Sequence, residues 1–79
     1  VQKKANEYIK NKGVKLDSSL NPNNSSWRGR ISTVQEYLND GSALKSCKGY
    51  TDIMINEMGT ENTEAYCYYD GHSLYILYV

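Results

Sequence analysis

The chain has 79 residues and a mass of 9.0 kDa, and its nine basic side chains balance nine acidic ones. This length allows one small domain with a marginal core. The neutral net charge argues against nucleic acid as a partner and against a polybasic segment that binds a membrane surface. A mean hydropathy of −0.69 excludes a transmembrane span within these residues. The eight tyrosines and one tryptophan, without phenylalanine, favour half-buried sheets and wet surfaces over a sealed interior.

The N-terminal residues predict an amphipathic helix over residues 1–12. Apolar side chains recur at positions 1, 5, 8 and 9, which lie on one helical face, and Gly13 is a suitable C-terminal stop. No capping residue precedes this helix. We therefore expect it to continue upstream of Val1, where any export signal or membrane anchor would also lie.

Residues 14–30 predict a loop region, with a short extended piece at Val14–Leu16 and polar, turn-forming residues after it. Trp27 lies at the end of this region, beside two arginines, and we expect it to pack the loop onto the core. The alternative is an exposed aromatic that stacks on a sugar or contacts a partner protein. The two arginines do not predict a nucleic-acid site in a neutral chain.

A short second helix is predicted over residues 32–40. Ser32 and Gln35 match a capping box, and Val34, Tyr37 and Leu38 fall on one face before Gly41. A helix of this length needs a surface to pack on.

The C-terminal residues 50–79 predict a three-stranded antiparallel meander. Alternating residues indicate strands over 50–56, 64–69 and 73–79, and Asp70 with Gly71 is a hairpin signal. The predicted fold class is therefore α+β, with the two helices packed on this sheet.

Cys47 and Cys67 are the two cysteines of the chain, and an even count is typical of a small secreted domain with a disulfide. Cys67 shares one side of its strand with Ala65 and Tyr69, so we expect it to face inward. A bond to Cys47 would then tie the loop before the first strand onto the sheet, worth about 3 kcal/mol in the chain-entropy model. The alternative is two buried free thiols in a cytosolic protein. The spacing of cysteines and histidine predicts no metal site.

Residues Ile31–Gly41, Leu44–Tyr50 and Ala65–Cys67 together resemble small exported proteins of low-GC Gram-positive bacteria, of the type IV pilin-like and pseudopilin-like kind. The resemblance covers roughly residues 31–70 and implies a non-catalytic structural subunit at the cell surface, in or on a filament. It also implies that Cys47 and Cys67 enclose the C-terminal loop of the family. Residues 1–12 would be the lower half of its long helix, and a missing upstream segment would hold the subunit in the membrane.

The expected partners are further copies of the chain or another surface protein, because tyrosine and tryptophan are enriched at such contacts. Ordinary strand preference is the alternative explanation for the tyrosines. The candidate interface residues are Trp27, Tyr66, Tyr68, Tyr69, Tyr75 and Tyr78.

Two other non-catalytic functions fit the sequence. One is a secreted module that recognises carbohydrate or a host protein through Trp27 and the tyrosine-rich sheet. The other is a small phage or plasmid inhibitor that acts by surface mimicry, with reduced cysteines.

No catalytic residue or cofactor is predicted. His72 is the one strong candidate for acid–base chemistry near neutral pH, and it follows a turn where an exposed residue is expected. Its adjacency to Ser73 does not make a triad, and a pair with Cys67 would require a free thiol. The sequence has no glycine-rich phosphate loop.

Overall fold

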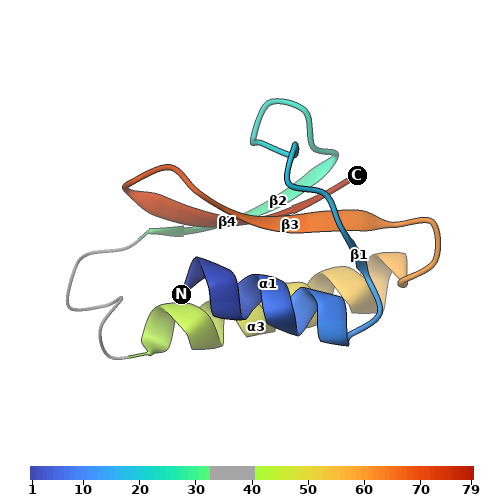
Figure 1. Ribbon diagram of the computed structural model, residues 1–79, viewed down its shortest axis with the longest axis horizontal. Coiled ribbons are helices and arrows are strands. Elements are labelled where there is room, and N and C mark those ends of the chain that lie inside the picture. Colours follow the sequence, from blue (N-terminus) through green and yellow to red (C-terminus); the bar gives the residue numbers. More distant parts are fainter. Residues whose placement is uncertain (33–40) are drawn as a thin grey trace.

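Two helices cover one face of a four-stranded sheet in the part of the chain that the computed structural model describes, residues 1–32 and 41–79 (Figure 1). The predicted α+β class is therefore confirmed. The elements in chain order are α1 (Gln2–Asn11), β1 (Lys15–Leu16), β2 (Trp27–Ser32), α3 (Ser42–Met58), β3 (Glu64–Tyr69) and β4 (Ser73–Tyr78).

The sheet has the strand order β1-β3-β4-β2 and is mixed, so the predicted three-stranded antiparallel meander is wrong in strand number and direction. β1 runs parallel to β3, whereas β3 with β4 and β2 with β4 are antiparallel. The β3–β4 hairpin is present as expected, and Gly71 in its turn has φ of 95°, which favours glycine.

The predicted first strand over residues 50–56 is wrong, because these residues form the second half of α3. The alternation of Thr51, Ile53 and Ile55 resembles a strand only in a window that begins at residue 50. A window that begins earlier shows helical spacing, and the residues at that spacing are the ones buried. They are Ala43, Cys47, Thr51 and Met54.

The predicted loop region over residues 14–30 ends in a strand, which sequence analysis did not predict. Trp27, Gly29 and Ile31 of β2 lie toward the helices, and Arg28 and Arg30 lie on the opposite side. Two arginines and a glycine give this segment a low intrinsic preference for a strand. Pairing with β4 nevertheless imposes the strand conformation. The predicted helix over residues 32–40 falls on the undescribed residues 33–40, and Ser32 is the last residue of β2.

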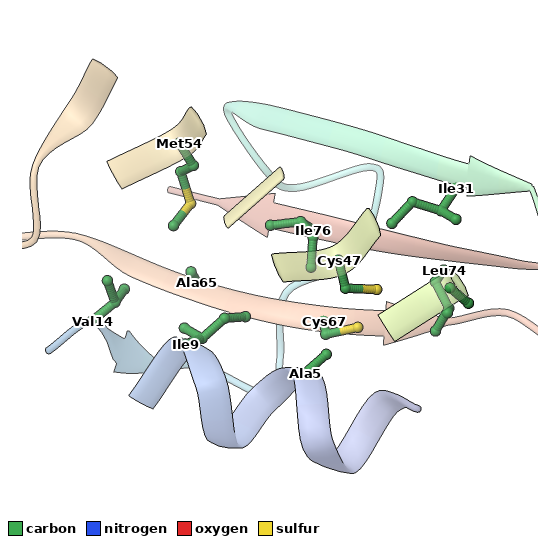
Figure 2. Packing of buried hydrophobic residues seen from close by; sticks show 11 residues of the cluster. Ala5, Ile9, Val14, Ile31, Cys47, Met54, Ala65, Cys67, Leu74 and Ile76 are labelled. Carbon is green, nitrogen blue, oxygen red and sulfur yellow. The ribbon is translucent and has the colours of Figure 1, made fainter. Parts of the chain in front are cut away.

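The core lies between the helices and the sheet. Ala5 and Ile9 of α1 point toward β3, whose Ala65 and Cys67 belong to the same buried cluster (Figure 2). The predicted N-terminal helix is thus present as α1, and its buried face is the apolar stripe. The buried cluster is made up of Ala5, Ile9, Val14, Ile31, Ala43, Cys47, Met54, Ala65, Cys67, Leu74 and Ile76.

Candidate functional site

The strand alternation gives the sheet two different faces. One face carries Ala65 and Cys67 of β3 and Leu74 and Ile76 of β4, and the helices bury it. The opposite face, which we call the open face, has neither α1 nor α3 on it (Figure 1). Its side chains are Arg28, Arg30, Glu64, Tyr66, Tyr68, Ser73, Tyr75 and Leu77.

The open face brings together tyrosines from two strands. Tyr68 of β3 pairs with Tyr75 of β4, and their ring centroids are 6.1 Å apart with planes tilted by 52°. Tyr66 stands two residues before Tyr68 on the same face, and all three side chains are half-buried. The Tyr75 hydroxyl also donates to Oδ2 of Asp70 at 3.3 Å, which orients it. Tyr66, Tyr68 and Tyr75 together make up the tyrosine surface of the open face, which carries neither α1 nor α3.

One end of the open face is covered by the loop between β1 and β2. Leu77 and Leu20 are both buried, and neither belongs to the core cluster on the helix side. Figure 1 places this loop across the sheet from the helices. Arg28 fixes the loop, because its Nη1 donates to the backbone oxygen of Pro22 at 2.7 Å. The loop therefore leaves open the end of the face that carries Tyr68 and Tyr75, whereas Tyr66 lies opposite the covered Leu77.

Arg28 and Arg30 lie beside the tyrosines, although neither is among the interface candidates predicted from the sequence. Arg28 is opposite Leu77 and Arg30 is opposite Tyr75 in the β2–β4 register. The Nε of Arg30 donates to Oγ of Ser73 at 3.2 Å. Among the described residues, neither arginine has a carboxylate partner within 4.0 Å. The alternation of Trp27, Gly29 and Ile31 with two arginines is the signal that could have identified this strand.

The other predicted interface residues lie on the helix side of the sheet. Trp27 is half-buried against Tyr50 of α3, with ring centroids 6.3 Å apart at 64°. Tyr78 packs against the core cluster. Tyr69 is 40% exposed, and its hydroxyl donates to the backbone oxygen of Gly71 at 3.2 Å. The structure therefore separates the six candidates into two groups of three, on opposite faces.

Gly29 explains how α3 approaches the sheet so closely at Trp27. A Cβ atom at residue 29 would lie 2.6 Å from Cδ1 of Tyr50 and 3.1 Å from Cη2 of Trp27. A contact of 2.6 Å is far inside van der Waals separation, so the tyrosine ring occupies the space of the missing side chain. Trp27 and Tyr50 thus form a packing unit, as sequence analysis expected for Trp27.

Cys47 and Cys67 are free thiols, so the predicted disulfide is not present. The two thiols are 4.1 Å apart and fully buried, one on α3 and one on β3 (Figure 2). Cys47 is therefore on a helix and not in a loop before a strand. The neighbouring Cys47 thiol and burial raise the pKa of Cys67, whereas the contact with Cys67 lowers the pKa of Cys47.

The outer edge of β3 is closed by side chains of α1. The Asn6 side chain accepts a hydrogen bond from the Cys67 N–H at 2.8 Å, and its amide donates to the Cys67 carbonyl at 3.2 Å. Gln2 donates to the same carbonyl at 3.0 Å. β1 pairs only with Glu64 and Ala65, so these amides continue the edge pairing where β1 has ended. Cys67 is therefore held by β4 on one side and by the side-chain amides of α1 on the other.

His72 and Ser73 take structural positions in the hairpin turn. The backbone N–H groups of both residues donate to Oδ1 of Asp70, at 2.8 and 2.7 Å. These hydrogen bonds lower the pKa of Asp70, and the one from the Ser73 N–H has the larger effect. Cys67 lies on the buried face of β3, whereas His72 is exposed in the turn. Burial thus separates Cys67 from the one histidine of the chain.

Residues 1–32 and 41–79 hold no cluster of three or more histidine, cysteine, aspartate or glutamate side chains suited to a metal ion. Within the same ranges no helix combines the length and apolar character needed to cross a membrane.

Comparisons with protein-family models, with curated proteins and with solved structures find no match to the chain.

Proposed function

We propose that this protein is a non-catalytic extracellular subunit, pilin-like in its role, that contacts neighbouring subunits through the open face of its sheet. The observation that carries the proposal is the tyrosine surface formed by Tyr66, Tyr68 and Tyr75, on the face that carries neither α1 nor α3. A tyrosine supplies a large contact area and a hydrogen bond at a low cost in conformational entropy. Arg28 and Arg30 beside it add the other residue type that is enriched at binding hot spots.

Two features of the architecture support a subunit of the pilin-like kind. The N-terminal helix α1 packs on β3, in line with a long helix that carries a small sheet domain. The buried cysteine pair lies where oxidation would join α3 to β3. In an exporting pathway, exchange with the disulfide of an oxidoreductase would form the Cys47–Cys67 bond and leave that oxidoreductase with two thiols. The proposal also requires a membrane-anchoring segment upstream of Val1.

A secreted binding module is the second candidate, and the same tyrosine surface favours it. In this case the surface would bind a carbohydrate or a host protein and not another copy. Trp27 is not part of the proposed surface, because it packs against Tyr50 on the helix side. The two candidates therefore share Tyr68 and Tyr75 and differ in what these residues contact.

The experiment replaces the paired tyrosines in the full-length gene product, in the cell that makes it. The variant is Tyr68→Ser with Tyr75→Ser, and the matched control is Tyr69→Ser, an exposed tyrosine of the same strand on the opposite face. Chemical cross-linking at the cell surface should give a ladder of multimers for the native chain and the control. The double variant should give monomer.

Two results would contradict assembly through the open face. The first is that the native chain, the control and the double variant all stay monomeric. The second is a ladder that persists in the double variant, which would show that the subunits do not contact one another through the open face. A single cross-linked species that contains a different protein, lost in the double variant, would support the binding module. Intact mass without reductant gives a separate test of export, since the disulfide form is lighter by two hydrogen atoms.

A further inference from the structure

Within residues 1–32 and 41–79, the outer edge of β2 has backbone groups without a partner strand. β2 is the last strand in the order β1-β3-β4-β2, so only its β4 side is hydrogen-bonded within the sheet. Among the described residues, no segment pairs with its other side. At β3, by contrast, Asn6 and Gln2 close the equivalent edge with side-chain amides. The two edges of this sheet therefore differ.

The register identifies the groups that point outward. Glu64 and Val79 exchange both of their backbone hydrogen bonds, so the N–H and C=O groups of Val79 face β3. Orientation alternates along a strand, so the groups of Tyr78 and Ile76 face β2 and bond there with their partners Trp27 and Gly29. The backbone N–H and C=O groups of Arg28 and Arg30 consequently point away from the sheet.

The side chains of Arg28 and Arg30 stand at the same edge, on the open face. Both are exposed, and neither has an acidic partner within 4.0 Å among the described residues. Residues two apart on a strand are separated by about 6.6 Å, so their side chains form a pair with fixed spacing along the edge. The guanidinium groups retain further donors, because each has five N–H groups and donates one hydrogen bond to the described part of the chain.

This charge pair argues against a second copy as the occupant of the edge. Two antiparallel registers of two β2 strands pair their outward backbone groups with the same overlap: one, centred on Gly29, places Arg28 of each copy opposite Arg30 of the other, and one, centred on Arg30, places the two Arg30 residues opposite each other. Like charges directly opposite on adjacent strands are destabilising. A strand with carboxylates at alternate positions meets the same two arginines with opposite charge and with the matching spacing.

We propose that the free edge of β2 is a docking site for an extended acidic strand of a partner protein. The partner adds a fifth strand to the sheet, and its backbone pairs with the N–H and C=O groups of Arg28 and Arg30. Its acidic side chains lie on the open face against the two guanidinium groups. This site is an edge of the sheet, so it is distinct from the tyrosine surface and does not depend on assembly through that surface.

The test uses a synthetic peptide of alternating valine and glutamate, acetylated and amidated, titrated into the folded chain and followed by amide NMR. At saturation, hydrogen exchange at the Arg28 and Arg30 amides should slow about tenfold or more, because these groups become hydrogen-bonded. Exchange at the Gly29 amide, which faces β4, should stay constant. Two control peptides carry lysine in place of glutamate or N-methyl groups on alternate amides, and both should bind at least about tenfold more weakly.

The variant Arg28→Gln with Arg30→Gln keeps the strand and removes both charges, and it should bind the acidic peptide about tenfold more weakly or worse. Four results would overturn the proposal. The first is no binding of the acidic peptide, in which case the arginines would serve only to prevent other strands from pairing with this edge. The second is equal binding of the lysine peptide, and the third is protection of the Arg28 and Arg30 amides in the free chain. The fourth is peptide binding that shifts Tyr68 and Tyr75 without amide protection, which would move the site to the tyrosine surface.

Discussion

The side chain of Asn6 pairs with the backbone of Cys67 as a neighbouring strand would, accepting from its N–H at 2.8 Å and donating to its carbonyl at 3.2 Å. These two hydrogen bonds connect residues 61 positions apart in the chain. They close an edge of the sheet that β1 leaves open after Ala65. A helix side chain thereby takes over the role of a missing strand.

Asn6→Ala is expected to destabilise the fold by about 1–3 kcal/mol, because it leaves part-buried backbone groups of Cys67 with fewer partners. Urea unfolding of the variant and the native chain measures the difference. The matched control is Asn11→Ala, an exposed position of the same helix, which should change stability by less than about 0.5 kcal/mol. Equal stability of both variants would show that the Asn6 hydrogen bonds contribute little.

Gly29→Ala should destabilise the protein by about 1–3 kcal/mol, because the added methyl group overlaps the Tyr50 ring. Gly49→Ala in α3 is the opposite case: nothing lies within 4 Å of its Cβ position. Alanine there should stabilise the helix by about 0.5–1 kcal/mol. Thermal unfolding of both variants tests the close approach of α3 to β2. If Gly29→Ala leaves the stability unchanged, the Tyr50 ring does not occupy the space beside residue 29.

Stability should fall in acid partly through Asp70. The backbone hydrogen bonds from Ser73 and His72 lower the pKa of this carboxyl in the folded state, so folding favours its charged form. The contribution is fully present above the unfolded pKa of about 3.9 and is lost as pH falls through the lower folded pKa. In a series of melting temperatures measured from pH 7 downward, the melting temperature should therefore decrease once the pH is below about 4.

Asp70→Asn should reduce the slope of that acid limb, because the asparagine cannot titrate. Glu57→Gln, an exposed carboxylate of α3, serves as the control and should leave the slope attributed to Asp70 in place. An unchanged acid limb in Asp70→Asn would contradict the assigned role of the turn.

Oxidation of Cys47 and Cys67 to a disulfide should raise stability by about 3 kcal/mol in the chain-entropy model. The thiols are 4.1 Å apart, so bond formation requires an approach of about 2 Å. Urea unfolding of the oxidised and reduced chains measures the effect, and the Cys47→Ala variant should show no difference between the two conditions. A less stable oxidised chain would mean that the α3–β3 packing resists this approach.

The hairpin and the N-terminal helix could be predicted from sequence because local signals agree with the final fold. Asp70 and Gly71 specify the turn, and the apolar stripe of α1 matches its buried face. The strand β2 could not be predicted in the same way. Its pairing with β4 joins residues more than 40 positions apart, and Arg28, Gly29 and Arg30 give it weak intrinsic preference.

The candidate surface was predicted in part. Inspection of the strands identified Tyr66, Tyr68 and Tyr75, and the fold places these three together on the open face. Whether an aromatic residue faces the helices depends on which side of the sheet they cover, and this depends on tertiary packing. Trp27 and Tyr78 lie on the covered side for that reason. Misassignment of residues 50–56 as a strand also concealed Tyr50 as the packing partner of Trp27.

The most direct measurement of the central claim is site-specific photo-cross-linking from the open face in the producing cell. A photoreactive phenylalanine analogue replaces Tyr68, and in a control chain it replaces Glu57, which is exposed on α3. Light should convert the chain labelled at residue 68, but not the control, into dimers and higher multimers of itself. Labelled chains that remain monomeric at residue 68, or that cross-link equally from residue 57, would contradict assembly through the open face.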